Sequence, residues 1–182
     1  MKNREELPSF DDGRWVFCPD IIAFGEFWIP VIKIDKDSWF GLTRSGNWVC
    51  GAERIGDQVI LVEKQSPPVC LLPILELQRE DFELRLKSAL AEVGAGKSVE
   101  DTFPVITAIR CGMEIGSDYW ASRALSWLRN YTIPGQFLKV LGGLTKAPWA
   151  SQSTRQLARN LISKVKAVPA QPTVKDEKES EA

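Results

Sequence analysis

Histidine is absent from this chain of 182 residues. Its absence excludes Ser-His-Asp and Cys-His catalysis, histidine metal ligands and an imidazole switch near neutral pH. The four cysteines, Cys18, Cys50, Cys70 and Cys111, lie far apart in the sequence and form no CxxC pair. We therefore expect no zinc site, redox motif or cofactor, and interpret these cysteines as small buried apolar residues.

Long apolar runs are also missing. No stretch of about 18 apolar residues occurs, so no membrane-spanning segment is expected. The first residues, Met1 to Glu6, are mostly polar and do not lead into the apolar centre of a signal peptide. A cytoplasmic protein without membrane contact is the resulting expectation.

Acidic residues are absent between Tyr119 and Lys175, although this segment carries nine Lys and Arg residues. Residues 1–118 contain 13 basic and 20 acidic residues, and the whole chain has a net charge of −1. An almost neutral total therefore conceals an acidic first part and a purely basic segment. Solvated helix faces usually mix both signs, and this segment does not.

The part of the chain up to Lys64 shows strand patterns rich in aromatic and branched side chains. Gly46 in the connection between two of these runs predicts a β-hairpin. Pro30 interrupts another run, which predicts an edge strand or two short strands, because proline cannot donate a ladder hydrogen bond. The runs are 14–18, 24–34, 38–43, 47–52 and 58–64.

Apolar spacing changes to a helical period after a connector, residues 65–73, that contains three prolines and cannot be helical throughout. We predict helices near residues 82–93, 104–115, 117–130, 137–142 and 151–166. Gly94 is expected to end the first of them. Ile106 is expected on the buried stripe of the second, and Ser117 is expected to cap the third.

Together these patterns predict an α+β fold, in which an N-terminal antiparallel β-meander packs with a C-terminal bundle of about five helices. The expected organisation is a mobile lead-in (1–13), an antiparallel β region (14–76), a helical region (77–168) that shares one core with the sheet, and a disordered acidic tail (169–182).

Two patterns bear on catalysis. Gly94–Ser98 contains the Gly-Lys-Ser end of a phosphate-binding loop, but Ala91 stands where that motif needs glycine, and a predicted helix precedes it instead of a strand. We therefore predict a loop between helices there. Asp35, Glu80 and Asp81 would have to converge in a cleft to form a carboxylate-based hydrolase, which stays an alternative function.

The tryptophans of the predicted sheet leave two interpretations open. Trp28, Trp39 and Trp48, interleaved with Arg44 and Arg54, could stack single-stranded bases. They could equally be core residues. The acidic charge of this part of the chain opposes phosphate binding and favours the core.

A basic face is predicted on the last helix. Gln152, Arg155, Arg159 and Lys166 fall, with Ser163, within about 80° of one another at about 100° per residue. Arg155 and Arg159 are i,i+4 neighbours with no carboxylate between them. We predict that this face binds an acidic protein. Nucleic acid, the protein's own acidic segments and plain solvation are the alternatives.

Two predicted helices share one pattern. It consists of Tyr119-Trp120, Ala124-Leu125 and Trp127-Leu128 in one helix, and Arg155, Leu157-Ala158 and Leu161-Ile162 in the other. The spacing from Ala124 to Ala158 is a plausible repeat length. Residues 103–165 resemble the paired helices of HEAT-like proteins, and similar helices occur in small bacterial immunity and adaptor proteins. The resemblance implies binding through a helical surface without catalytic residues, so we expect a non-enzymatic protein-binding module.

Overall fold

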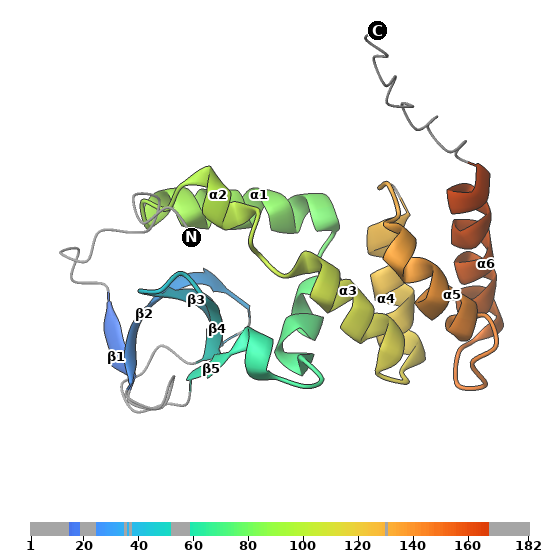
Figure 1. Ribbon diagram of the computed structural model, residues 1–182, viewed down its shortest axis with the longest axis horizontal. Coiled ribbons are helices and arrows are strands. Elements are labelled where there is room, and N and C mark those ends of the chain that lie inside the picture. Colours follow the sequence, from blue (N-terminus) through green and yellow to red (C-terminus); the bar gives the residue numbers. More distant parts are fainter. Residues whose placement is uncertain are drawn as a thin grey trace, which may run out of the picture.

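The computed structural model describes residues 15–18, 25–34, 36, 38–51, 59–129 and 131–167. It shows an antiparallel sheet followed by helices, so the predicted α+β fold class is confirmed (Figure 1). The predicted lead-in and acidic tail lie outside the described residues. Among the described residues, no helix is both long enough and apolar enough to cross a membrane.

The strands are β1 (Val16–Cys18), β2 (Glu26–Lys33), β3 (Trp39–Thr43), β4 (Trp48–Gly51) and β5 (Val59–Leu61). The 3-10 helices are η3 (Val62–Lys64), η4 (Val69–Glu76) and η5 (Gly135–Phe137). The α-helices are α1 (Arg79–Glu92), α2 (Lys97–Glu100), α3 (Val105–Glu114), α4 (Asp118–Leu128), α5 (Leu138–Leu144) and α6 (Gln152–Ala167).

The five strands form one curled antiparallel sheet in chain order, each paired with the next (Figure 1). Side chains alternate between the two faces of a strand, and here both faces are buried. Trp28 and Val49 belong to a small cluster on one face. Ile29, Leu42 and Trp48 belong to the main core, which also contains the helices.

Strand β2 has paired neighbours on both sides, so the prediction of an edge strand or two short strands is wrong. The described residues of β1 pair with residues 26–28, and Pro30 lies beyond them. The register between β2 and β3 also shifts between Pro30 and Ile32. A proline beside a bulge and beyond a short neighbouring strand interrupts little of the ladder, so the strand continues past it.

Two predicted turns are confirmed by glycines with positive φ. Gly46, with φ of 80°, closes the hairpin between β3 and β4. Gly94, with φ of 74°, follows the end of α1. Residues 94–96 therefore connect α1 to α2, as predicted, whereas Lys97 and Ser98, which were predicted to lie in the same loop, begin α2.

Helix η4 begins within the connector and continues past it, and it was missed by the sequence patterns. It includes Pro73 and buries Leu71, Leu72, Ile74 and Leu75. It packs against both α3 and α4, and thus joins the sheet to the helical region. At eight residues η4 is long for a 3-10 helix, and burial of its four apolar side chains stabilises it.

Helices α3 to α6 pack as two pairs. Helix α3 contacts α4, α5 contacts α6, and the pairs meet through α3 with α5 and α4 with α6. Helix α3 also buries Gly112, whose position for a Cβ lies 2.7 Å from Leu75 Cδ1 and 3.0 Å from Ala124 Cβ. Its buried stripe is turned toward η4 and α4, so Ile106 is exposed and the prediction for Ile106 is wrong.

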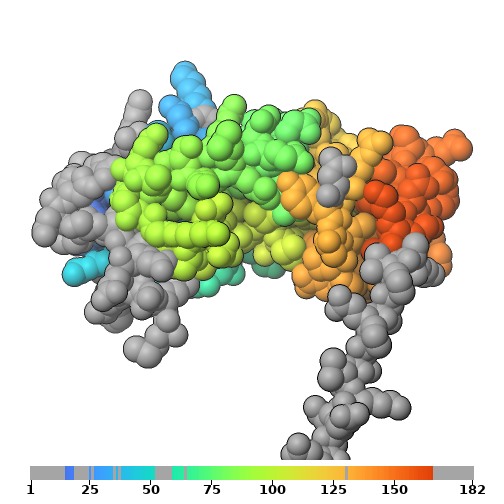
Figure 2. Space-filling view, turned by 90° about the horizontal axis from the view of Figure 1, so that it is seen from above, coloured from blue at the N-terminus to red at the C-terminus, as the bar shows by residue number. Residues whose placement is uncertain are grey.

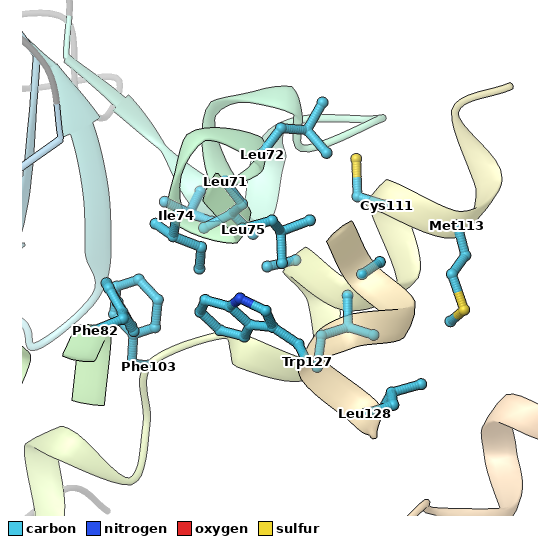
Figure 3. Packing of buried hydrophobic residues seen from close by; sticks show 14 of the residues in the cluster. Leu71, Leu72, Ile74, Leu75, Phe82, Phe103, Cys111, Met113, Trp127 and Leu128 are labelled. Atoms are coloured by element: carbon cyan, nitrogen blue, oxygen red, sulfur yellow. The ribbon is translucent and has the colours of Figure 1, made fainter. Parts of the chain in front are cut away.

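A chain of aromatic rings connects the sheet to the helices. Phe103 contacts Trp48 of β4 and Phe82 of α1, with ring centroids 4.8 and 5.1 Å apart. Phe82 in turn lies 5.6 Å from Trp127 of α4. Figure 3 shows the Trp127 ring pointing toward Phe82 and Phe103, and its Nε1 donates to the Leu77 carbonyl at 2.9 Å. Sheet and helices therefore share one buried cluster.

Candidate functional site

The outer face of α6 is polar and free of acids. Its inner side buries Thr154, Ala158 and Leu161 against the other helices. The side chains on the outer face are exposed: Gln152, Gln156, Arg159, Asn160, Ser163 and Lys164. Helices α5 and α6 form one end of the molecule, away from the sheet (Figure 2).

The residues of the predicted basic face differ in their exposure and contacts. Gln152 and Arg159 are exposed. Arg155 is partly buried, and its Nη1 donates to the carbonyls of Ala147 at 3.2 Å and Ala150 at 2.7 Å. Arg155 thus holds the turn between α5 and α6. Lys166 belongs to α6, but its side chain lies outside the described part.

The start of α6 is held by a carboxylate from another helix. Asp118 Oδ1 accepts a 2.7 Å hydrogen bond from the Ser151 backbone N–H. The Thr154 N–H donates to Ser151 Oγ at 3.2 Å, as in an N-cap. The Ser151 N–H and the hydroxyls of Thr154 and Ser151 lower the pKa of Asp118 below its usual 3.8. Ser117 occupies the N-cap position of α4, but it makes no side-chain cap hydrogen bond.

The exposed cations near α6 contact neutral oxygens. Arg159 Nη1 donates to Gln156 Oε1 at 3.1 Å. Lys164 Nζ donates to the carbonyl of Arg129 at 3.0 Å. In the described part of the chain neither has a carboxylate within ion-pair distance. We call Arg129, Arg159 and Lys164 the basic surface. Its positive charge is exposed to solvent.

A groove of about 550 Å³ lies between α3, α5 and the turn that precedes α6. Arg110 and Glu114 of α3, Gln136 of η5 and Lys139 of α5 are its polar lining. Its apolar lining includes Met113, Val140, Leu144 and Trp149. The sequence patterns did not reveal this groove, because three segments form it. A tryptophan in the proline-containing turn Lys146–Ala150 was the available signal.

The candidate catalytic acids are not gathered in this groove. Glu80 and Asp81 are exposed in the first turn of α1, and neither lines it. Asp35 lies outside the described residues. Within the described residues, no group of three His, Cys, Asp or Glu side chains is placed to hold a metal ion.

Three cysteine side chains lie near one another at the junction of β4, η4 and α3. Hydrogen bonding with the Cys50 thiol, and then burial, raise the pKa of Cys70. Burial and the charge of Glu114 raise the pKa of Cys111. Because a thiolate is the reactive form, a protonated thiol at neutral pH is a poor nucleophile.

The sheet tryptophans are mostly core residues. Trp28 and Trp48 are 1% and 6% exposed. Trp39 is partly buried, and Lys33 Nζ lies 5.5 Å from its ring centroid. Trp48 Nε1 donates to Thr102 Oγ1 at 3.0 Å. Trp28 and Trp48 therefore present no open ring face on which a base could stack.

Comparison of the chain with protein-family models, with curated proteins and with solved structures finds no match. The HEAT-like resemblance therefore stays a prediction.

Proposed function

We propose that this protein is a non-enzymatic binding module that contacts an acidic protein through its basic surface, Arg129, Arg159 and Lys164. The observation that carries this proposal is the neutral surroundings of these cations. Residues 119–167 contain eight Lys and Arg residues and no acid. The hydrogen bonds of Arg159 and Lys164 to amide and carbonyl oxygens leave their charges uncompensated.

Such a charge layout favours association with an acidic surface. A patch of one sign raises the local concentration of an oppositely charged partner and accelerates encounter. Exposed charges such as those of the basic surface contribute mainly to the rate and the specificity of association. The resemblance to HEAT-like immunity and adaptor proteins supports a role of that kind in the cytoplasm of a bacterial cell.

The test is charge reversal on this surface. Arg159→Glu combined with Lys164→Glu is expected to abolish recovery of a cross-linked acidic partner from host extract, identified by mass spectrometry. The matched control is Lys87→Glu with Lys97→Glu, two exposed lysines on α1 and α2. An identical partner set for the reversed variant and the wild type would contradict the proposal.

Nucleic acid is the alternative partner for the same surface. The affinity for nucleic acid would fall steeply as the salt concentration rises, because Lys and Arg side chains displace counterions from the phosphates when they bind. A titration of generic DNA and RNA at low and at physiological salt distinguishes a nucleic-acid partner from a protein partner. It uses the wild type, the charge-reversed variant and the control variant. Affinity lost only in Arg159→Glu with Lys164→Glu would assign the surface to nucleic acid instead.

A further inference from the structure

The groove between α3 and α5 has an apolar floor with two cations at its rim. Met113 and Leu144 are almost completely buried beneath it. Arg110 and Lys139 lie at its edges on facing helices. An apolar floor with a few convergent polar groups is the usual composition of a ligand site.

The two cations have no carboxylate partner in the described residues. Arg110 and Glu114 stand at the i,i+4 spacing at which ion pairs commonly form, yet no pair joins them. Arg110 Nη2 donates to the amide oxygen Gln136 Oε1 at 3.2 Å, and its buried Nε has no hydrogen-bond partner in the described part of the chain. The guanidinium therefore retains both its charge and its capacity to donate to a carboxylate.

Trp149 supplies an apolar contact at the end of the groove. It is 38% exposed, whereas most large apolar side chains of this protein are buried. The turn that carries it is held by Arg155 through the Ala147 and Ala150 carbonyls. An exposed tryptophan on a fixed turn beside a concave surface has the features of an interface anchor, because little ordering entropy is lost when it is covered.

The groove is long enough for a short peptide. Gln136 and Leu144 both line it, and the helical segment between them spans about 12 Å at about 1.5 Å per residue. An extended peptide covers that length with about four residues at about 3.3 Å each. Ala147 and Trp149, in the turn that follows α5, also line the groove.

We propose that this groove binds an extended peptide segment of a partner protein in which an Asp or Glu side chain adjoins a bulky apolar side chain. The carboxylate pairs with Arg110 and Lys139, and the apolar side chain packs on Met113, Leu144 and Trp149. None of the groove residues belongs to α6 or to the basic surface. The site therefore goes beyond the proposed function and can be tested independently of it.

The probe is a phage-displayed library of random peptides of about seven residues, longer than the groove requires. Selection on the wild-type protein is expected to enrich sequences with Asp or Glu beside Leu, Ile, Phe or Trp. The enrichment should vanish with Arg110→Gln combined with Lys139→Gln. It should persist with Lys146→Gln, an exposed lysine close to the groove that does not line it.

Calorimetry with the most enriched synthetic peptide then measures each residue. Arg110→Gln and Trp149→Ala are each expected to weaken binding about tenfold, and Arg110→Lys less than Arg110→Gln because it keeps the charge. Lys146→Gln, and Arg159→Glu with Lys164→Glu, should leave the affinity within about twofold. Unchanged circular dichroism melting confirms folding of every variant used.

Three outcomes would overturn the site. The first is the absence of any enriched peptide, and the second is enrichment that ignores Asp and Glu or persists in Arg110→Gln with Lys139→Gln. The third is binding of indole-3-acetate as tightly as the best peptide, because that result would assign the groove to small carboxylates instead of a peptide.

Discussion

Cations beside the core and cations of the C-terminal helices meet different neighbours. Arg79 of α1 forms a 2.7 Å ion pair with Glu83, and its guanidinium lies 3.4 Å from the ring centroid of Tyr131. Arg110 and Arg159 instead donate to amide oxygens. The charge of Arg79 is largely compensated and serves the fold. The charges of Arg110 and Arg159 remain available to a partner.

Gly41 of the sheet and Gly142 of α5 also differ in their surroundings. Gly41 of β3 has no space for a side chain, because a Cβ there would collide with the Ile29 carbonyl and lie 2.5 Å from Trp28 Cε3. Gly142 of α5 has no atom within 4 Å of that position. Gly41 is therefore packed to contact, whereas Gly142 has open space beside it.

The largest expected effect is a difference in stability between alanine substitutions at these two glycines. Gly41→Ala should lower the free energy of unfolding by about 2–3 kcal/mol, since the strands or Trp28 must shift. Gly142→Ala should raise it by roughly 0.5–1 kcal/mol, because alanine favours a helix and nothing obstructs it. Urea denaturation monitored by circular dichroism measures both. Equal effects would show that the two positions do not differ in packing.

An intermediate effect should distinguish the two arginines of the predicted basic face. Arg155→Ala removes two hydrogen bonds to carbonyls, so it should cost about 1–2 kcal/mol of stability. Arg159→Ala removes one exposed contact and should change stability by less than about 0.5 kcal/mol. The same urea experiment compares them. A cost for Arg159→Ala as large as that for Arg155→Ala would place Arg159 among the residues that serve the fold.

The smallest expected effect concerns pH. The pKa of Asp118 is lowered in the folded protein, so its contribution to stability is present above the usual 3.8 and is lost as the pH falls below that value. Asp118→Asn should therefore make the melting temperature less dependent on pH below about 4. Thermal melts at several pH values measure the slope. A slope as steep as that of the wild type would exclude Asp118 as the titrating group.

Local patterns predicted much of the fold. The hairpin at Gly46, the end of α1 at Gly94 and the range of α6 depend on residues close together in the sequence. Helix η4 escaped prediction because its three-proline surroundings argue against a helix, and contacts with distant segments such as α3 and α4 stabilise it. Ile106 was misplaced because a periodic stripe does not reveal which neighbours a helix will have.

The candidate sites also differ in how far the sequence could predict them. The acid-free segment could be counted directly, and it led to Gln152, Arg155, Arg159 and Lys166. The engagement of Arg155 with the turn before α6 could not be foreseen, because its acceptors are backbone carbonyls that carry no sequence signal. The groove was also invisible, since Arg110 and Lys139 lie on different helices, far apart in the sequence.

The sequence by itself determined most of the segments that form strands or helices and how the charge divides along the chain, because both depend mainly on neighbouring residues. Tertiary structure decided which cations stay uncompensated and where a concave surface forms. Those properties depend on atoms that only folding brings together, such as the Arg110 guanidinium, the Gln136 amide and the Trp149 ring.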